Sequence, residues 1–430
     1  MIKTLEYVET PNELPKSTSV VIIGGGIVGI SAALTLAERN IPVVVLEKGF
    51  VGAEQSARNL GWIRKTNRHA EDIPLALAAD RLWADMPNRI GRDVDYQRSG
   101  IMFLSPNEQQ TAVQEAWLKS VEHLNIDSKM LSKKEIDAMV PGGVGQWNGG
   151  LYTESDGRAE PSIATSAMAK AAIQKGAIVV QNCAVRGLSR SAGKVSGVIT
   201  EKGEIQCEQV LLAGGAWSRR FLGNHGVSLP SLHLICSVLR TKPMEGPTDI
   251  AVAAPNFSFR KHLDGGFVIM QRGAIEAPLT LDHLLIGHRY LHQLKEQGSA
   301  LRISLGKHFL KDLKIPRRWS IETPTFFENI RTMDPIHNPS LNQEALTNLR
   351  KAWPQFKQAD IAEEWAGMID VTPDSKPVID QISAIPGLTI ATGFSGHGFG
   401  TGPAAGHLAA DLVSGVEPIV DPKPYQFSRL

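Results

Sequence analysis

Residues 20–29 read Val-Val-Ile-Ile-Gly-Gly-Gly-Ile-Val-Gly, a run of four β-branched residues that leads directly into a cluster of glycines. This order predicts a buried strand, a tight turn and a helix over residues 27–39. Gly24 permits the turn, Gly26 lets a pyrophosphate approach the backbone, and Gly29 lets the helix pack closely on the sheet. The start of that helix offers unpaired N–H groups and a positive dipole end to an anion.

A second strand, residues 41–46, follows after Asn40 and ends on Glu47. An acidic residue about 20 positions beyond the glycines suits a clamp on ribose hydroxyls. Glycine-rich turns are common by themselves, but the strand, turn, helix, second strand and acid together make the pattern specific for dinucleotide binding. The alternative interpretation is a plain βαβ crossover that binds no ligand.

The composition limits the class of protein. A length of 430 residues is typical of two or three domains, and 42% hydrophobic with 21% charged residues are ordinary globular values. The net charge of +1 argues against nucleic-acid binding, which needs a strong basic excess. Cys183, Cys207 and Cys236 fit neither a metal site nor a disulfide framework, so we expect no metal and a cytoplasmic protein with reduced thiols. Residues 1–19 are polar, which predicts neither a signal peptide nor a membrane-spanning segment.

Residues 48–68 follow the nucleotide strand and are rich in glycine, polar and cationic residues. We expect this segment to lie against the cofactor as a loop or a helix start. Ser56 and Arg58 suit phosphate contacts. Charged side chains are mostly exposed, so the default expectation for the other basic residues is a solvated face. These residues are Arg64, Lys65 and Arg68.

The rest of the chain mixes helices and strands. Helical spacing covers residues 72–88, 106–125, 132–139 (with a Ser132/Glu135 capping box) and 160–175. Strands are expected at 102–104, 178–181, 184–188, 210–216, 231–241, 266–270 and 388–391. A hairpin joins 194–200 to 204–208, and the glycine-rich residues 141–156 are expected to be irregular.

Residues 279–313 become helical and mixed in charge. Their apolar residues are spaced for one helix face: Leu281, Leu284, Leu285, Tyr290, Leu291 and Leu294. Such spacing most often marks a stripe that packs on a core. The sharper alternative is a docking or membrane-edge module.

A second glycine-rich loop, residues 392–402, reads Thr-Gly-Phe-Ser-Gly-His-Gly-Phe-Gly-Thr-Gly. It opens a helix over residues 403–414, with Pro403 expected in the first turn. The positive end of this helix can also face negative charge. Two such turns near opposite ends of the chain predict a cofactor that spans both ends of the sheet, which a simple nicotinamide domain does not need.

These motifs resemble the FAD-dependent amine and amino-acid oxidases. The resemblance rests on the first glycine motif with Glu47, on Ser56-x-Arg58, on Gly-Gly-Ala-Trp-Ser at 214–218 and on Gly-Phe-Ser-Gly-His-Gly-Phe at 393–399. It covers nearly the whole chain, and within the family it is nearest to the L-amino-acid deaminases of Proteus. Segments similar to those enzymes are 53–56, 182–187, 201–203, 212–218 and 402–406.

The resemblance implies an α/β (α+β) two-domain fold. A Rossmann-like FAD-binding domain of the glutathione-reductase type would be built from three separated segments, residues 1–88, 155–230 and 355–430. An antiparallel-sheet substrate-binding domain would take residues 89–154 and 231–354. A helical insertion module is expected at about 275–345, where the deaminases carry one.

The resemblance also implies a chemistry. An amino acid, expected to be the L form, transfers hydride from Cα to N5 of FAD, and water hydrolyses the imino acid to a 2-oxo acid and ammonia. Holding the substrate carboxylate favours a bidentate arginine. By position, Arg272 is similar to the carboxylate-binding arginine of the deaminases, with Arg64 as the second candidate. Trp62 and His397 fall where those enzymes line the pocket, and His397 either contacts substrate or bonds the backbone over the flavin ring.

The same resemblance implies contacts with a non-covalent FAD along much of the chain. The expected residues are Gly24, Gly26, Ile27, Val28, Gly29, Glu47, Lys48, Gln55, Ser56, Arg58, Asn59, Leu60, Val185, Ala213, Gly214, Trp217, Gly393, His397, Gly398, Phe399, Gly400 and Thr401. The reduced flavin is expected to pass its electrons to molecular oxygen or to a respiratory-chain acceptor.

Departures from the family pattern keep alternatives open. The Proteus enzymes begin with a membrane-spanning segment that this sequence lacks, which favours oxygen over a membrane quinone and leaves a peripheral contact with the inner membrane as an alternative. Gly400 stands where sarcosine oxidases place a lysine, and no cysteine follows Cys236 to link the flavin covalently. Residues 58–64 look more like D-amino-acid or opine dehydrogenases. The rival functions are therefore a D-amino-acid, N-methyl-amino-acid or opine dehydrogenase or oxidase, and an FAD-binding electron-relay subunit without its own substrate.

Overall fold

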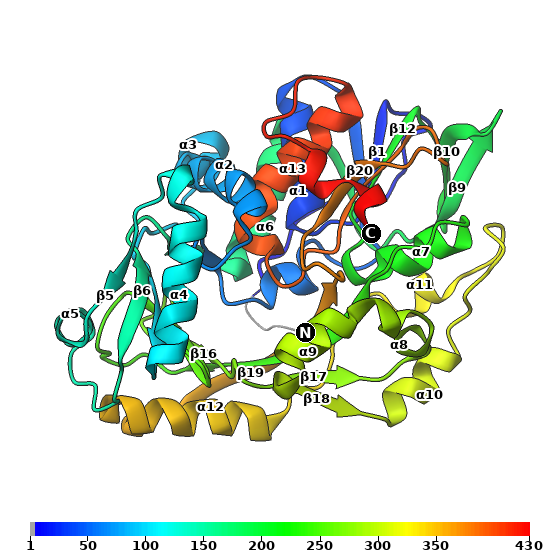
Figure 1. The fold of residues 1–430 in the computed structure, drawn as a ribbon. Coiled ribbons are helices and arrows are strands. Elements are labelled where there is room, and N and C mark those ends of the chain that lie inside the picture. The colour runs from blue at the N-terminus through cyan, green and yellow to red at the C-terminus, as the bar shows by residue number, and fades with distance from the viewer. Residues whose placement is uncertain (1–4) are drawn as a thin grey trace.

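The computed structural model describes residues 5–430, and its first sheet is built around the glycine-rich stretch (Figure 1). Strand β1 (Val20–Ile23) pairs in parallel with β2 (Val43–Leu46) on one side and with β12 (Gln209–Leu212) on the other. The six-stranded order is β20-β21-β12-β1-β2-β8. The edge strands are β8 (Ile178–Val180) and β20 (Val378–Gln381), and β20 runs antiparallel to its neighbour β21 (Leu388–Thr392). The sheet thus joins segments from the beginning, middle and end of the chain.

A second sheet of ten strands occupies the lower part of Figure 1. Its order is β18-β17-β13-β16-β15-β14-β4-β6-β5, with β19 paired to β13. Most neighbouring strands are antiparallel, as expected, while β14–β4 and β17–β18 are parallel pairs. The strands are β4 (Ile101–Ser105), β5 (Ser128–Leu131), β6 (Gly149–Thr153), β13 (Leu232–Thr241), β14 (Ala251–Ala254), β15 (Phe257–Lys261), β16 (Phe267–Met270), β17 (Ile275–Pro278), β18 (Leu301–Ser304) and β19 (Ile361–Val371). Helix α12 (Pro339–Ala352) packs its leucines against this sheet. The domain boundaries expected from the sequence stay predictions.

Most of the helices form where their periodicity predicted them. They are α1 (Ile27–Glu38), α2 (Ile73–Ala84), α3 (Met86–Ile90), α4 (Glu108–Ser120), α5 (Lys133–Met139) and α6 (Pro161–Gln174). The capping box of Ser132 and Glu135 is present at the start of α5. The predicted hairpin is formed by β10 (Lys194–Thr200) and β11 (Gly203–Gln206), and β9 (Val185–Ser191) extends it.

The expectation of irregular structure over residues 141–156 is wrong for β6. This strand is buried along its whole length between β4 and β5. A Cβ on Gly150 would lie 3.3 Å from both the Ile136 side chain and the carbonyl oxygen of Phe103. The glycines of this strand therefore allow α5 and β4 to pack closely, a role that glycine has in some strands. In the sequence alone, the same glycines look like the signal for a loop.

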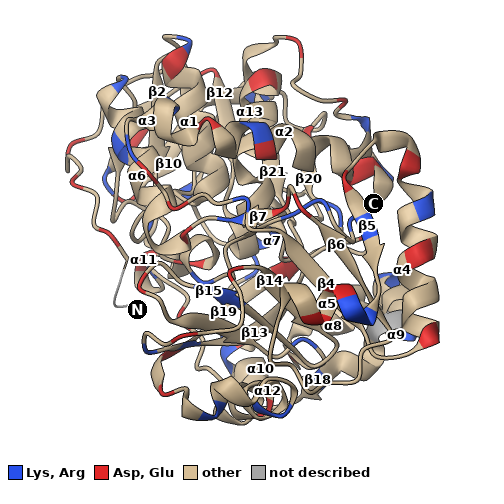
Figure 2. Ribbon diagram, turned by 90° about the vertical axis from the view of Figure 1, so that its left-hand side faces the viewer, with Lys and Arg blue, Asp and Glu red and all other residues tan. Residues whose placement is uncertain are grey.

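Charged residues of both signs are interspersed along the chain, in keeping with the net charge of +1 (Figure 2). Within residues 5–430, no helix is long and apolar enough to cross a membrane. The same residues hold no group of His, Cys, Asp and Glu arranged to bind a metal ion.

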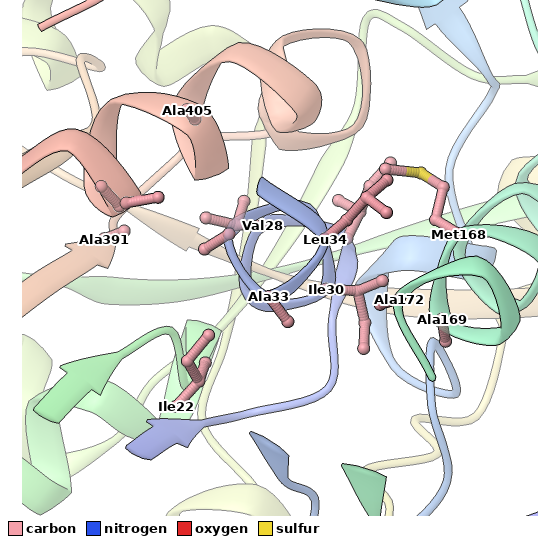
Figure 3. Packing of buried hydrophobic residues seen from close by; sticks show 14 of the residues in the cluster. Ile22, Val28, Ile30, Ala33, Leu34, Met168, Ala169, Ala172, Ala391 and Ala405 are labelled. Carbon is pink, nitrogen blue, oxygen red and sulfur yellow. The ribbon is translucent and has the colours of Figure 1, made fainter. Parts of the chain in front are cut away.

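Helix α1 is buried on every side, and Figure 3 shows its packing. Ile30, Ala33 and Leu34 face the sheet and α6, while Val28 faces α13 (Gly398–Ser414). A Cβ on Gly406 of α13 would lie 2.5 Å from the Val28 carbonyl oxygen. This close approach of two helices on one sheet places both of their N-termini toward the same ligand-binding edge.

The segment 279–313 does not form the packed helical stripe expected from its leucines. It breaks into α8 (Leu281–Ile286), α9 (Leu291–Gln297), β18 and α10 (Lys307–Leu313). Four of the leucines are exposed, with relative exposures of 66% for Leu284, 52% for Leu285, 58% for Leu291 and 39% for Leu294. Tyr290 is buried, and its hydroxyl donates to the Val371 carbonyl oxygen at 2.6 Å, with the Pro230 carbonyl oxygen at 3.0 Å as the alternative acceptor. Helices of six or seven residues, interrupted near Gly287 and Gly298, cannot keep one face on a core over the whole segment.

Candidate active site

A cavity lies at the carboxyl ends of β1, β2 and β12, the edge of an open parallel sheet where ligands bind. Predicted cofactor contacts that line it are Gly24, Gly26, Ile27, Val28, Glu47, Lys48, Gln55, Ser56, Asn59, Val185, Ala213, Gly214, Trp217, Gly398 and Phe399. Lining residues that the sequence did not single out include Glu54, Cys183, Met368, Asp370 and Phe394.

The glycine-rich turn leaves no room for side chains. A Cβ on Gly24 would lie 2.4 Å from the Ala213 carbonyl oxygen, and one on Gly29 would lie 2.2 Å from the Gly24 carbonyl oxygen. Gly24 also has a positive φ of 112°, which favours glycine. Beside this turn the Ile27 N–H donates to Ser56 Oγ at 2.9 Å, so the loop 48–59 is joined to the start of α1. The bare backbone at the helix start suits a diphosphate.

Glu47 ends β2 in the position expected for a ribose clamp. Its Oε2 accepts the Gly25 N–H at 2.7 Å, and its Oε1 accepts the Gly49 N–H at 2.7 Å. Burial raises the pKa of this carboxyl, opposed by the charge of Lys48 and by the two backbone N–H groups. Each oxygen keeps a further lone pair, so the fixed carboxyl group can accept hydroxyl hydrogens from a ligand.

Glu54 organises the neighbouring wall of the cavity, although no sequence motif selects it as a contact. It accepts hydrogen bonds from Lys48 Nζ at 2.9 Å, from Trp217 Nε1 at 3.1 Å and from the Met333 N–H at 2.9 Å. Lys48 Nζ also lies 4.5 Å from the centroid of the Trp217 ring. Three distant segments therefore meet on one carboxylate, a contact that no local motif encodes.

The other end of the cavity is built around α13, which begins at Gly398 rather than at residue 403. Pro403 lies inside the helix and not in its first turn, because the flexible glycines before it join the helix. Asp370 anchors the preceding loop, since its Oδ2 accepts the Gly393 N–H at 2.7 Å. A Cβ on Gly400 would lie 2.6 Å from the Trp62 carbonyl oxygen, so the site has no space for a lysine there. The two helix N-termini and the Glu47 carboxyl group fit an extended dinucleotide such as FAD.

Three of the predicted catalytic residues, Arg64, Arg272 and Trp62, lie around Phe103 of β4, and His397 contacts Arg64. Arg64 Nη2 lies 2.8 Å from His397 Nε2, and its guanidinium carbon lies 5.7 Å from the Phe103 ring centroid. The Arg272 guanidinium carbon lies 4.9 Å from the same centroid. Trp62, in β3 (Trp62–Ile63), contacts the ring edge to face at 5.9 Å. Residues far apart in the sequence thus form one cluster, although Phe103 was not predicted as part of it.

Two cations of this cluster lack an acidic partner. Neither Arg64 nor Arg272 forms an ion pair with a carboxylate in the described part of the chain; each donates to a backbone carbonyl, Thr66 and Ala254 respectively. Burial, followed by the charges of Arg68 and Arg272, lowers the pKa of Arg64 to about 9. Burial lowers the pKa of Arg272 to about 10. An anion placed between the two guanidinium groups can accept charge-assisted hydrogen bonds from both of them. It does not have to displace a carboxylate of the protein to do so.

The expected solvated basic face is wrong for Lys65 and Arg68, which are only 1% and 4% exposed. Lys65 Nζ lies 3.3 Å from Asp156 Oδ1, and Arg68 pairs with Asp72. Buried cations are retained in proteins when they are paired. Arg68 Nε also donates to the Arg64 carbonyl oxygen at 2.8 Å, so these pairs hold the backbone that carries Arg64.

Other predicted contacts lie outside the lining of the cavity: Gly29, Arg58, Leu60, Gly393, His397, Gly400 and Thr401. Arg58 is buried, and its guanidinium donates to the Ala53 and Ala366 carbonyl oxygens and pairs with Asp334. It therefore ties loops together beside the cavity. Cys183 lines the cavity, and burial raises the pKa of its thiol.

We expect His397→Phe to lower kcat/KM about tenfold, mainly through KM, because Arg64 loses an acceptor worth about 1.5 kcal/mol. His397→Gln restores an acceptor and is expected to recover most of the loss. Burial, followed by Arg68 and Arg64, places the pKa of His397 well below its ordinary value of 6.5, so the ring stays neutral as the pH falls through 6.5. The pH profile of kcat/KM between about pH 6 and 8 is therefore expected to keep its shape in both variants. A limb near pH 6.5 that disappears on substitution would contradict this assignment.

Comparison with known proteins places these observations in a family. Residues 19–412 match the protein family described as FAD dependent oxidoreductase. The structure of L-amino acid deaminase from Proteus myxofaciens in complex with anthranilate aligns with a TM-score of 0.95 at 32% identity, covering 99% of this chain and 96% of that one. The Proteus vulgaris L-amino acid deaminase with its specific insertion sequence deleted gives 0.79 at 27% identity, covering 99% and 97%. Glycine oxidase of Pseudomonas aeruginosa is 26% identical over 421 residues, 95% of this chain and 98% of that protein.

Proposed function

The chain belongs to the FAD-dependent oxidoreductase family, and we propose that it oxidises a primary L-amino acid to the 2-oxo acid and ammonia. It is an FAD-dependent oxidoreductase acting on amino donors. The observation that carries the finer proposal is the pair Arg64 and Arg272, two half-buried guanidinium groups without a carboxylate partner in the described residues. The similarity to the Proteus deaminase supports the L form.

Arg272 and Arg64 hold the substrate carboxylate in this proposal. A guanidinium presents a planar fork of donors to both carboxylate oxygens, which fixes the orientation of Cα as well as its distance. His397 accepts from Arg64 and keeps that fork in place. Phe103 and Trp62 present aromatic surfaces beside the two arginines, which exclude water from the bound carboxylate. FAD, when bound, supplies the hydride acceptor for the Cα–H bond.

The cofactor side of the proposal uses the chain's own cavity residues. The turn at Gly24 and Gly26 and the start of α1 receive the diphosphate, while Glu47 accepts ribose hydroxyls. The loop 393–398 and the N-terminus of α13 lie at the flavin end, next to His397. The domain segments expected from the sequence are part of this proposal. So is the insertion module at about 275–345. It is supported by the TM-score, which is 0.95 with the Proteus myxofaciens deaminase but 0.79 with the Proteus vulgaris deaminase whose insertion is deleted.

Anaerobic mixing of the purified, FAD-loaded protein with amino acids tests the reaction. We expect L-phenylalanine or another primary L-amino acid to bleach the visible flavin absorbance, while the D enantiomer, sarcosine and glycine leave it unchanged. Bleaching by the D form or by N-methyl compounds alone would contradict the proposal and would favour a D-amino-acid, N-methyl-amino-acid or opine dehydrogenase. Failure of all of them would favour the electron-relay subunit. Oxygen consumption compared with reduction of an artificial dye then separates oxygen from a respiratory-chain acceptor.

A further inference from the structure

A second cavity, of about 260 Å³, opens beside helix α7 (Ser218–Asn224), and none of its lining residues lines the flavin cavity. Four arginines line it: Arg219, Arg220, Arg317 and Arg318. The first two come from α7, and the other two follow α10 in the inserted segment. The cavity therefore lies where the inserted segment meets the remainder of the chain.

Two carboxylates neutralise only part of this charge. Asp282 of α8 lies 2.8 Å from both Arg219 and Arg317 and 3.7 Å from Arg220. Asp312 of α10 pairs with Arg220. Burial alone would raise the pKa of Asp282, but hydrogen bonds from Arg317 and Arg219 lower it to about 2. Four guanidinium groups therefore face two carboxylates, which leaves an excess of two positive charges.

The paired arginines still have N–H groups without acceptors. Nε of Arg219, Nη1 of Arg220 and Nη2 of Arg317 are buried and have no hydrogen-bond partner among the described residues. Arg220 is itself only 7% exposed. Buried donors normally find acceptors, so the two carboxylates leave these four arginines short of acceptors where they meet.

Arg318 stands at the open side of the cavity. It is exposed and forms no ion pair with a carboxylate in residues 5–430. Its charge reaches the neighbouring His225, because burial, Arg190 and Arg318 together lower the pKa of that imidazole to about 4. The mouth of the cavity is therefore electropositive, and an anion that enters it meets Arg318 first.

We propose that this cavity binds a phosphate group, held between α7 and the inserted segment by Arg219, Arg220, Arg317 and Arg318. Inorganic phosphate is a dianion near neutral pH and matches the excess of two charges, whereas a phosphodiester headgroup neutralises one of them. The tetrahedral oxygens of either can accept from guanidinium forks that approach from different elements. The group belongs either to free phosphate or to a phospholipid headgroup. Leu310 and Leu313 on the neighbouring α10 are 61% and 51% exposed, so apolar side chains that could contact lipid acyl chains lie near the cavity.

The test uses the full-length holoenzyme in chloride buffer at constant ionic strength. Inorganic phosphate is titrated by calorimetry and by thermal unfolding, and we expect saturable binding with a rise in Tm. Arg318→Glu is expected to weaken phosphate binding at least about tenfold, since it reverses a charge at the mouth. The residue is exposed, so its Tm without phosphate should match the parent. Arg302→Glu, an exposed arginine on β18 outside the cavity, is the matched control and should bind phosphate normally.

Vesicles of phosphatidylglycerol and of phosphatidylcholine distinguish the two sources of phosphate. Sedimentation with phosphatidylglycerol that Arg318→Glu abolishes and Arg302→Glu preserves would assign the site to an anionic headgroup. Binding of inorganic phosphate with no such sedimentation would assign it to the free ion. No stabilisation beyond that of chloride, combined with no cavity-dependent vesicle binding, overturns the proposal. Equal weakening by both variants also overturns it, because general charge then explains the binding.

Discussion

Arg272→Met is expected to lower kcat/KM for the amino-acid substrate about 100- to 1,000-fold while the protein keeps its flavin. Removing one partner of a desolvated charge pair costs roughly 2–5 kcal/mol, and each 1.36 kcal/mol corresponds to a factor of about ten in rate. Methionine preserves much of the aliphatic volume against Phe103, so packing around the ring changes little. The measurement is steady-state kinetics at saturating acceptor, with flavin content and Tm recorded alongside.

Two companion variants make this result specific. Arg272→Lys retains the charge without the fork and is expected to fall between the parent and Arg272→Met. Arg81→Met removes an exposed arginine on α2 and should leave kcat/KM unchanged. Unchanged kinetics for Arg272→Met would remove Arg272 from carboxylate binding. A large loss with Arg64→Met alone would then assign that role to Arg64.

Gly29→Ala is expected to yield protein without bound flavin and with a free energy of unfolding lower by about 3 kcal/mol or more. The new Cβ would lie 2.2 Å from the Gly24 carbonyl oxygen, a backbone atom that cannot turn away as a side chain does. Helix α1 would have to move off β1, and the turn that faces the diphosphate would move with it. The readouts are the flavin-to-protein ratio after purification and chemical denaturation.

Gly223→Ala is the matched control for that experiment. Gly223 also lies in a helix, α7, but a Cβ there meets no atom within 4 Å. Alanine is the better helix former by about 1 kcal/mol, so this variant should keep its flavin and gain slightly in stability. Normal flavin content in Gly29→Ala would show that the turn tolerates displacement of the helix, and would contradict a tight packing of α1 on the Gly24 carbonyl oxygen.

The parts of the fold that could be predicted are those encoded by neighbouring residues. The strand, turn and helix around Gly24–Gly29 follow from a hydrophobic run, glycines and helical spacing within one short stretch. The Ser132/Glu135 capping box and the hairpin at 201–203 are equally local. Family resemblance extended this to Arg272, Arg64 and Trp62, which the structure brings around one aromatic ring, and to His397, which contacts Arg64.

What could not be predicted depends on partners far along the chain. Lys65 and Arg68 look like solvent-facing cations until Asp156 and Asp72 are placed beside them. Glu54 gains its role from Trp217 and Met333, more than 160 residues away. The leucines of 281–294 have helical spacing, yet short broken helices leave several of them in solvent. Glycine in β6 marks close packing, whereas glycine at 24 marks a turn, and only the surroundings distinguish the two.

The burial of the cysteines has a consequence for how such an enzyme survives its own turnover. A flavoprotein that reduces oxygen releases hydrogen peroxide beside its cofactor, and peroxide attacks thiolates far faster than protonated thiols. Cys183 lines the flavin cavity with a raised pKa, and burial raises the pKa of Cys207 and of Cys236 to about 12. The three thiols therefore carry even less thiolate at neutral pH than an ordinary cysteine does, which lowers their reactivity toward any peroxide that forms at the flavin.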